Sequence, residues 1–454
     1  MEKKLEKIVG APADALDKTV TFSENIARRG GVGKARKFWH NLGPGLTTGA
    51  SDDDPSGIAT YSQAGAAYGF QFLWMALFTF PLMSLVQEMC ARIGLVTGRG
   101  LAANIRIHFP KWVLYLTTAL LFFANTLNIG ADVGAMARST QLVLPDFNFA
   151  TLVFGFAIVS LGLQIFVSYE KYARYLKWLA LVLLSYILSA LSVNLDFKEI
   201  IRNTVIPTIE FSREQVVLIA AVLGTTISPY LFFWQTSQEV EENILKGQTS
   251  VKLRKEAVTD GEIKNMRFDV VSGMFLSNLV MFFIIAATAA TLFASGIRTI
   301  PTVEEAAAAL RPIAGDQAFL LFTLGIVGTG MLTIPILAGS ASYAMSESFG
   351  WKFGLYRKLK EANAFYGIII ISTFLGVALN FVGINPIKAL ILAAVVNGLV
   401  APVILVMILL LSSNKKLMGE RVNHPVAIIF GWGITIIMAL AGAATIYFAI
   451  ETVF

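Results

Sequence analysis

The sequence predicts an all-α, polytopic membrane protein, and three observations lead to that prediction. Of the 454 residues, 56% are hydrophobic and only 15% are charged, and the mean hydropathy is +0.67. A soluble domain carries about 25% charged residues. The apolar residues stand in long runs, such as LVLLSYILSALSV and VMFFIIAATAATLFA, and a membrane-spanning helix needs about 20 such residues. Composition therefore favours a membrane protein over the soluble classes.

Hydropathy along the chain predicts eleven membrane-spanning helices. The predicted spans are 42–66, 70–95, 112–137, 148–167, 173–194, 214–236, 268–295, 317–346, 363–384, 387–412 and 424–450. Residues 1–40 are polar and charged, without the apolar core and small-residue cleavage site of a signal peptide. The charged segment 237–265 is consistent with either a solvated loop or a helix on the inner membrane surface.

The eleven spans divide into two sets of five and one further helix. Because five is an odd number, the second set has the inverted orientation of the first. We therefore predict four parts of the chain, which are a cytoplasmic tail at 1–40, a first inverted repeat at 41–195, a second at 212–412, and an eleventh helix at 424–451.

Lysine and arginine are distributed unevenly between the two sides of the predicted membrane. With the N-terminus inside, 29 of the 36 fall in the tail and the inner loops and seven in the outer loops. The positive-inside rule thus predicts a cytoplasmic N-terminus, an extracellular C-terminus and a multi-pass protein of the plasma membrane. The net charge of +6 follows from these loops and implies no nucleic-acid partner. The single cysteine, Cys90, excludes an internal disulfide and a thiolate metal cluster.

Spans 1 and 6 are each interrupted at the middle. Span 1 contains SDDDPSG at 51–57, and span 6 contains GTTISPY at 224–230. Proline removes a backbone donor and clashes with the preceding turn. In lipid, the freed carbonyls need partners from the protein or from a water-filled cavity. Paired interruptions at matching positions of inverted halves indicate a transport site near the midplane of the membrane.

Three consecutive carboxylates precede the proline of span 1. Asp52, Asp53 and Asp54 repel one another in a low-dielectric environment unless a cation, water or protons compensate, and no lysine or arginine stands within the middle of a predicted span. A bound divalent cation explains Asp54, which directly precedes the break. For Asp52 and Asp53, a place in a solvated vestibule is an equally good explanation.

The residues around both interruptions resemble the natural resistance-associated macrophage protein (Nramp) family of divalent metal transporters. The segment GPGLTTGASDDDPSGIATYSQAGAAYGF is similar to the first helix of that family, which reads Gly-Pro, then Asp-Pro-Gly-Asn, then Gln-Ala-Gly-Ala. The family's Ala-x-x-Met-Pro-His motif corresponds to 225–230, and QEMCARIGLVTGRGLA also resembles a family segment. The resemblance runs from Gly43 to the end of span 10 or 11. It implies a LeuT-like fold of two inverted five-helix repeats, with a metal site between broken helices 1 and 6.

The sequence departs from the family pattern at the positions that would bind the ion. Gly57 replaces the asparagine, Ser228 replaces the methionine, and Tyr230 replaces the histidine. This pattern resembles the divergent Nramp-related magnesium transporters more than the transition-metal branch. A thioether favours Mn²⁺, Fe²⁺ and softer ions, whereas Mg²⁺ keeps several waters and takes one or two carboxylates. Small residues at the breaks would leave room for a partly hydrated ion.

We therefore predict one set of metal-binding positions and one of secondary site residues. The metal-binding set is Asp54, Gly57, Thr225 and Ser228, and the secondary set is Asp53, Ser56, Tyr230, Asp132 and Asn397. Asp132 aligns loosely with an acidic residue that the family uses in proton transfer, and a packing role is equally consistent with it. A phenol keeps its proton at neutral pH, unlike a histidine, so Tyr230 predicts transport without obligatory proton coupling.

The function predicted from the sequence is secondary transport, with uptake of Mg²⁺ and also Mn²⁺ by alternating access. The divalent cation is the substrate, the lipid bilayer is the surrounding partner, and no resident cofactor or enzymatic activity is expected. The oligomeric state is not predicted. Three alternatives stay open, which are a proton-coupled Mn²⁺/Fe²⁺ transporter of the same family, a non-transporting membrane sensor with the same fold, and a sodium-coupled amino-acid carrier. The acidic site disfavours the last of these.

Overall fold

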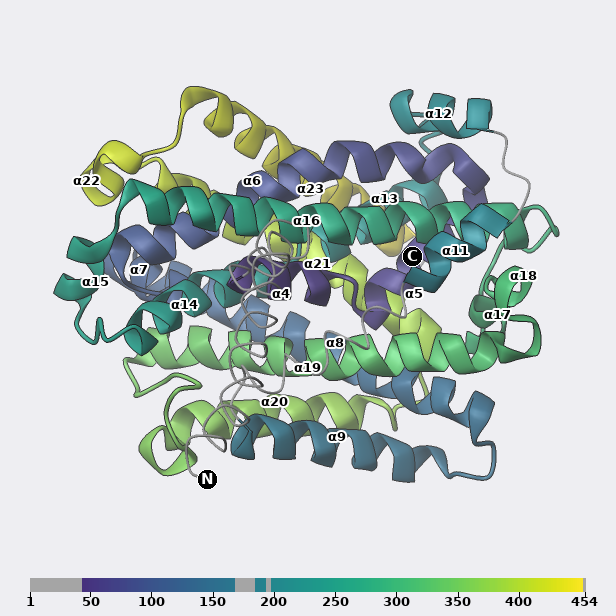
Figure 1. The fold of residues 1–454 in the computed structure, drawn as a ribbon, viewed down its shortest axis with the longest axis horizontal. Helices are drawn as coiled ribbons and strands as arrows, with labels where there is room; N and C mark the ends of the chain where they lie inside the picture. Colours follow the sequence, from purple (N-terminus) through teal and green to yellow (C-terminus); the bar gives the residue numbers. More distant parts are fainter. Residues whose placement is uncertain (1–42, 168–183, 193–196, 452–454) are drawn as a thin grey trace, which may run out of the picture. The chain divides into compact units, whose positions relative to one another are not determined.

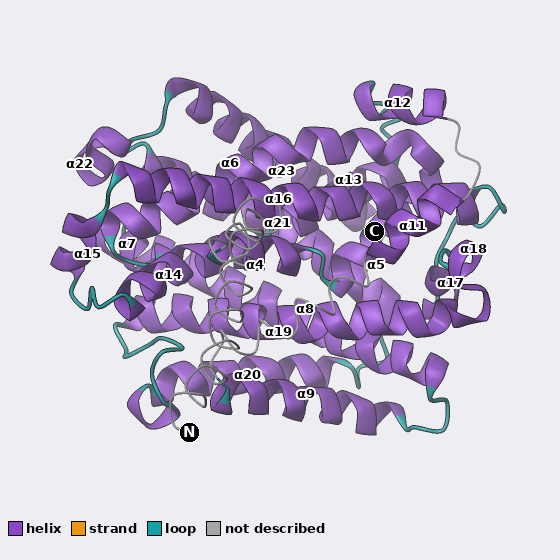
Figure 2. Ribbon diagram, viewed as in Figure 1, coloured by secondary structure: helices purple, strands orange, loops and turns teal. Residues whose placement is uncertain are grey.

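The structure, a computed structural model, describes residues 43–167, 184–192 and 197–451. These residues are helical and contain no strand (Figures 1 and 2). One compact unit runs from Pro44 to Phe454, and it holds every helix discussed below. Of the predicted fifth span, residues 173–183 and 193–194 lie outside the described residues.

The first five predicted spans correspond to one broken helix and four further helices. The broken helix comprises α4 (Pro44–Asp52) and α5 (Pro55–Tyr68). A short 3₁₀ turn, Gly69–Phe72, leads into α6. The remaining helices of this half are α6 (Leu73–Thr97), α8 (Lys111–Val143), α9 (Phe149–Phe166) and α11 (Leu184–Ser192), with the short α7 (Leu101–His108) after α6 and α12 (Phe197–Val205) after α11.

The second half repeats the pattern, with a broken helix first. This helix comprises α13 (Arg213–Thr226) and α14 (Pro229–Leu245). The long helices that follow are α16 (Asp260–Thr288, continued by a π-helical turn over Ala289–Phe293), α19 (Ala318–Phe349), α20 (Asn363–Leu379), α21 (Pro386–Ser412) and α23 (Pro425–Glu451). Short helices connect them, namely α15 (Val251–Ala257), α17 (Val303–Ala308), α18 (Arg311–Ala314) and α22 (Lys415–Met418).

Eight helical stretches in the described part of the chain are long and apolar enough to cross a membrane. One of them, Pro55–Thr97, contains the second half of span 1 and all of span 2, and the shorter apolar helix Asn363–Leu379 matches span 9. Several helices extend beyond the predicted spans. For example, α16 begins at Asp260, because a capping box between Thr259 and Glu262 starts the helix within polar sequence that hydropathy does not count.

The segment 237–265 is mostly helical. Helix α14 continues to Leu245, α15 follows, and α16 begins at Asp260. Its residues are therefore divided between the ends of two long helices and one short connecting helix.

Both breaks occur at the residue before a proline. A proline disfavours the helical conformation of the preceding residue, and Asp54 and Ser228 are both extended, with ψ of 170° and 132°. Each proline then begins the next helix, where its missing N–H costs no hydrogen bond. The two breaks predicted from Pro55 and Pro229 are thus present.

The broken helices lie inside the bundle. Within Arg213–Leu245, 83% of an 18-residue apolar stretch is buried. The corresponding stretches of α9 and α23 are each only 28% buried. Figure 1 shows α4 and α5 between α16 on one side and α8 and α19 on the other, and these helices are in contact. The breaks are therefore shielded from lipid by neighbouring helices.

Close backbone packing holds α4 against α16. A Cβ atom on Gly49 would overlap the backbone of Gly273, and one on Gly273 would overlap the carbonyl of Gly45. At the beginning of α4, the Asp269 carboxylate of α16 accepts hydrogen bonds from Gly45 N (2.6 Å) and Leu46 N (3.3 Å). A carboxylate there satisfies the unpaired N–H groups of the helix and complements its dipole. The half-helix before the break is thereby fixed at its beginning.

Candidate functional site

Asp54 caps the helix that begins after the first break. Its Oδ1 accepts hydrogen bonds from Gly57 N (2.6 Å) and from Ser56 Oγ (2.7 Å). Its Oδ2 accepts one from Asn128 Nδ2 of α8 (3.0 Å). The side chain is 1% exposed. The proline before the helix and the cap at its N-terminus thus fix one ionisable carboxylate in the interior of the bundle.

The break leaves the Ser51 carbonyl near the end of α4 in need of partners, and two other helices supply them. The Tyr230 hydroxyl donates a hydrogen bond to Ser51 O (2.9 Å), and Thr333 Oγ1 donates a second (3.3 Å). Tyr230 is the second residue of α14. Its hydroxyl therefore joins the second break to the first. It also supplies the hydrogen-bond partner that a carbonyl freed by a helix break needs in lipid.

The second break meets the first at two hydroxyl groups. Ser56 Oγ and Thr225 Oγ1 are 3.5 Å apart. Ser228 Oγ donates hydrogen bonds back to Gly224 O (2.9 Å) and Thr225 O (2.8 Å), which satisfies carbonyls at the end of α13. Predicted residues from both breaks thus lie together at the point where the two half-helices end.

Gly57 lies in close packing. A Cβ atom added to it would stand 3.2 Å from Thr225 Oγ1 and 3.3 Å from Tyr61 Cε2. The space that a side chain would need at this position is therefore occupied by Thr225 and by the buried ring of Tyr61. In this structure the glycine brings the two breaks together rather than leaving an open space beside them.

The three consecutive aspartates do not converge on one point. Ser277 Oγ of α16 donates a hydrogen bond to Asp52 Oδ2 (2.7 Å) and a longer one to Asp53 Oδ1 (3.4 Å), whereas Asp54 is bonded to α8. In the described residues, no group of three or more His, Cys, Asp or Glu side chains is arranged to hold one metal ion. An ion bound at Asp54 would therefore need hydroxyl, amide, carbonyl or water oxygens as its other ligands.

Asp132 stands in α8 one turn after Asn128, so the two side chains share a helix face. Asp132 is fully buried, and within the described residues neither of its carboxylate oxygens has a hydrogen-bond partner. Asn128 Oδ1 and the Tyr61 hydroxyl are also buried without a partner in this part of the chain. Polar atoms left unpaired beside Asp54 are suited to contact a ligand or its waters.

Four buried carboxylates thus occupy the centre of the bundle, and none of them has a basic partner among the described residues. They belong to Asp52, Asp53, Asp54 and Asp132, and none is more than 3% exposed. The ion pairs found among the described residues involve none of them. An unpaired charge in such an environment is costly, so the site favours either a bound cation or added protons.

Asn397 is a predicted site residue that makes no hydrogen bond to Asp54. It lies in α21, fully buried, and neither its oxygen nor its nitrogen has a partner within the described residues. The next residue, Gly398, packs against the backbone of Gly224, just before the second break. Helix α21 is thus in close contact with α13 at the residue after Asn397.

Three residues of the site were not predicted from the sequence. Asn128, Ser277 and Tyr61 contact or adjoin the aspartates from α8, α16 and α5. Asn128 could have been predicted from the sequence. It precedes Asp132 by four residues within an apolar run, so the two residues share one face of a helix. Ser277 stands next to Asn278 in an apolar run, and its contact with the aspartates spans more than 220 residues of chain.

Comparison with known proteins extends over nearly the whole chain. The family model described as natural resistance-associated macrophage protein-like matches residues 45–448. The divalent metal cation transporter MntH of Aeromonas hydrophila is 28% identical over 407 residues, which cover 86% of this chain and 92% of that protein. Both coverage values are high, so the likeness does not rest on one motif.

Solved structures share the fold. The crystal structure of the Eremococcus coleocola manganese transporter matches with a TM-score of 0.69 at 16% identity and covers 89% of this chain and 86% of that one. Mhp1, a nucleobase-cation-symport-1 family transporter in a closed conformation, matches with a TM-score of 0.52 at 13% identity and covers 90% and 93%.

The predicted fold class is confirmed by these likenesses and by the two broken helices. It is an all-α, polytopic membrane protein of two inverted five-helix repeats in which helices 1 and 6 are interrupted. The predicted family resemblance is confirmed as well, since the family model matches residues 45–448. The chain belongs to the Nramp, or natural resistance-associated macrophage protein-like, family.

Proposed function

We propose that this protein is a secondary transporter that takes up divalent cations, Mg²⁺ and also Mn²⁺, through a site between its two broken helices. The observation that carries this proposal is the position of Asp54. Its carboxylate is held at the meeting point of both breaks, buried and without a basic partner among the described residues. The name of the relative from Aeromonas hydrophila, divalent metal cation transporter, supports the same class of substrate.

The donor atoms around Asp54 favour a hard ion. Hydroxyls of Ser56 and Thr225 and the amide of Asn128 surround the break, and the ring of Tyr61 packs against Gly57. Ser228 supplies a hydroxyl where the family pattern has a thioether. One carboxylate with neutral oxygens and retained waters is the kind of environment in which Mg²⁺ is usually bound. Mn²⁺ accepts the same oxygen ligands, and Ca²⁺ is disfavoured because it demands more direct ligands.

Uptake of Mg²⁺ needs no proton gradient in this proposal. An inside-negative membrane potential favours entry of two positive charges by about 4.6 kcal/mol per 100 mV. Tyr230 stands where the family pattern has a histidine, and its hydroxyl is engaged with Ser51 O. A phenol in that position keeps its proton at neutral pH and is a poor shuttle.

A second candidate is proton-coupled transport of Mn²⁺ or Fe²⁺. It is favoured by Asp132, a buried carboxylate near Asp54 whose oxygens have no partner within the described residues. It is also favoured by Met136, whose sulfur packs on Gly330 beside the ring of Pro55 and places a soft donor near the break. The solved structure with the higher TM-score is that of a manganese transporter.

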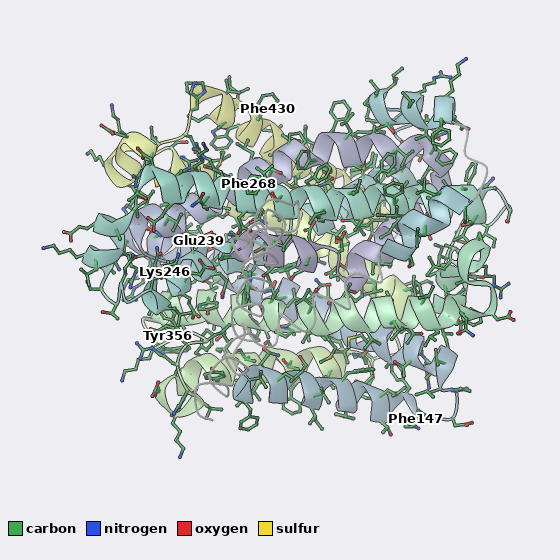
Figure 3. The ribbon with its side chains drawn as sticks, in the orientation of Figure 1. Phe147, Glu239, Lys246, Phe268, Tyr356 and Phe430 are labelled. Atoms are coloured by element: carbon green, nitrogen blue, oxygen red, sulfur yellow. The ribbon has the colours of Figure 1, made fainter. Side chains whose placement is uncertain are left out.

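The proposed orientation places the N-terminus in the cytoplasm and the C-terminus outside, in the plasma membrane. It is supported by the excess of lysine and arginine in the predicted inner loops. In Figure 3, Lys246 and Tyr356 of those loops lie at one end of the helices, and Phe147 of a predicted outer loop lies at the other.

The experiment that tests the proposal is uptake into proteoliposomes. Purified protein is reconstituted, the membrane potential is clamped inside-negative, and entry of Mg²⁺ or Mn²⁺ is followed with an internal indicator dye. We expect entry of both ions well above that into protein-free liposomes. No uptake of either ion at any clamped potential would instead favour the membrane sensor of the same fold.

A further inference from the structure

A strongly basic cavity of about 370 Å³ lies at the end of the bundle that carries the predicted inner loops. It is enclosed by the junction of α6 and α7, by α14 and α15, and by the segment that follows α19. Figure 1 shows α7, α14 and α15 gathered at this end, where Figure 3 labels Tyr356, one of the lining residues. Its basic lining residues are Arg99, Arg106, Arg254, Lys352 and Arg357, and its acidic one is Glu347.

None of these five basic side chains forms an ion pair with a carboxylate of the described residues. Elsewhere at this end basic and acidic side chains do pair: Glu88 with Arg92 (3.0 Å) and Arg267 (2.8 Å), and three further pairs are Lys246–Glu242, Lys252–Glu256 and Arg421–Asp260. The five cavity residues form none of these pairs. The positive charge of the cavity lining is therefore not cancelled by ion pairs in the described part of the chain.

The arginines of the cavity are held in place by neutral groups. Arg254 Nε donates to Gly98 O (2.9 Å), and its Nη1 donates to Gln248 O (3.0 Å) and Thr249 O (3.1 Å). Burial lowers the pKa of its guanidinium, the nearby Tyr356 opposes that change, and the positive charge of Arg99 adds to it. The charge of Arg254 is thus fixed, partly desolvated and close to a second cation, which are conditions that favour binding of an anion.

Two more arginines are also fixed. Arg106 Nη1 donates to Glu347 O (3.2 Å). Arg357 lies over the ring of Tyr356, with 4.9 Å between its Cζ atom and the ring centroid. A fixed guanidinium loses less conformational entropy when it binds, and its planar donors match the oxygens of a phosphate group.

The single carboxylate in the cavity wall is partly neutralised by a helix. Glu347 Oε2 accepts a hydrogen bond from Ala103 N in the first turn of α7 (2.9 Å). The N-terminal end of a helix carries a partial positive charge. The cavity therefore keeps a clear excess of positive charge despite Glu347. A neighbouring cavity of about 410 Å³ shares Arg99 and adds His108, Lys255 and Lys416 to the same region.

Aromatic side chains place the basic cavity at the level of the membrane surface. Trp351, which lines the cavity, stacks on Phe349, and Phe349 stacks on Tyr115. Trp112 is 67% exposed on the adjoining turn of α8. Tryptophan and tyrosine gather where membrane and water meet, and basic pockets between helices on the cytoplasmic side are suited to anionic headgroups.

We propose that this cavity binds an anionic phosphate group through Arg99, Arg254, Lys352 and their neighbours. The headgroup of an anionic phospholipid and free inorganic phosphate present the same charge-assisted hydrogen-bond acceptors. The site is separate from Asp54 and does not depend on which ion the protein transports.

The first test measures the melting temperature of the full-length protein in a neutral detergent. Sodium phosphate is titrated against sodium chloride at matched ionic strength, and a ligand that binds only the folded state raises the melting temperature. The variant is Arg99→Gln/Lys352→Gln. The matched control is Lys358→Gln/Lys360→Gln, which removes two exposed charges next to the cavity but none from its lining. We expect the first variant to bind phosphate at least about tenfold more weakly and the control to bind it normally.

The second test separates the two sources of phosphate. The parent protein, the cavity variant and the control are each placed in nanodiscs of phosphatidylcholine with or without phosphatidylglycerol. A rise in melting temperature with phosphatidylglycerol, lost in Arg99→Gln/Lys352→Gln and kept in the control, assigns the site to a lipid headgroup. A rise with inorganic phosphate alone, lost in the same variant, assigns it to a soluble anion. No rise with either probe, or an equal rise in all three proteins, overturns the proposal.

Discussion

The Asn128 amide donates a hydrogen bond to Oδ2 of Asp54, across a distance of 3.0 Å. The donor stands in the middle of α8 and the acceptor stands at the first break, so this bond joins an unbroken helix to the interrupted one. The amide oxygen of Asn128 stays buried and has no partner within the described residues. One amide group therefore orients the carboxylate and presents an acceptor to whatever binds beside it.

Asn128→Ala should weaken divalent cation uptake, because the Asp54 carboxylate would lose the hydrogen bond that orients it. A hydrogen bond to a charged group contributes about 1.5–3 kcal/mol, which corresponds to roughly tenfold or more in the apparent affinity for the ion. The measurement is the concentration dependence of Mg²⁺ uptake in proteoliposomes.

The matched control for that variant is Asn125→Ala. Asn125 stands one turn earlier in the same helix, is equally buried, and donates to Leu337 O (2.8 Å) and Ser340 Oγ (2.7 Å) instead. It should lower the melting temperature and leave the apparent affinity unchanged. Equal effects of the two variants on affinity would show that Asn128 acts through helix packing alone.

Ser228→Met should shift ion preference toward soft ions. A thioether adds little for Mg²⁺ and favours softer ions such as Cd²⁺, so Cd²⁺ should inhibit Mg²⁺ uptake at about tenfold lower concentration than in the parent. Ser228→Ala is the control, because it removes the same hydroxyl, with its bonds to Gly224 O and Thr225 O, and adds no sulfur. A parent protein that already takes Cd²⁺ far better than Mg²⁺ would refute the hard-ion argument.

Asp132→Asn should leave Mg²⁺ uptake at a fixed membrane potential largely intact. The reason is that entry is driven by voltage, while Tyr230 is a poor proton shuttle. Internal pH and internal Mg²⁺ are followed together in the same vesicles. Acidification that accompanies Mg²⁺ entry at a constant ratio, and disappears in Asp132→Asn, would establish proton coupling and favour the second candidate function.

Gly273→Ala should destabilise the protein strongly. Its new methyl group would overlap the backbone of α4 at Gly45 and Leu46, and overpacking of this kind costs about 1–3 kcal/mol. Gly155→Ala in α9 is the control, since nothing lies within 4 Å of its added Cβ, and it should be neutral or slightly stabilising. The measurement is the temperature at which the monodisperse chromatographic peak is lost. If the peak is lost at the same temperature in both variants, the backbones of α4 and α16 are not in close contact at Gly273.

The two breaks could be predicted from the sequence because their cause is local. Pro55 and Pro229 disturb the backbone of the residue that precedes each of them, and no other part of the chain is needed for that effect. The role of Asp54 as a cap follows from the same local rule, since aspartate before a helix accepts N–H bonds from its first turn. The approximate positions of the long apolar helices follow from apolar run length for the same reason.

The partners of the aspartates could not be predicted in this way. Ser277 meets Asp52 across 225 residues of sequence and Asn128 meets Asp54 across 74. Asp52 and Asp53 both accept hydrogen bonds from Ser277, whereas Asp54 accepts one from Asn128 on another helix, and no local rule separates the three. Some helices also extend past the predicted span, because capped polar turns such as the beginning of α16 continue beyond the apolar run.

The proposed transport depends most on Asp54 as the charged ligand of the divalent cation. The decisive measurement is the initial rate of Mg²⁺ and Mn²⁺ uptake by Asp54→Asn, which removes the charge but keeps a residue that caps helices as well as aspartate does. Asp146→Asn, which neutralises an exposed carboxylate between α8 and α9, is the control. We predict a loss of at least about a hundredfold in Asp54→Asn with an unchanged melting temperature, and normal uptake in Asp146→Asn. Near-normal uptake by a folded Asp54→Asn would show that Asp54 is not the charged ligand of the transported cation.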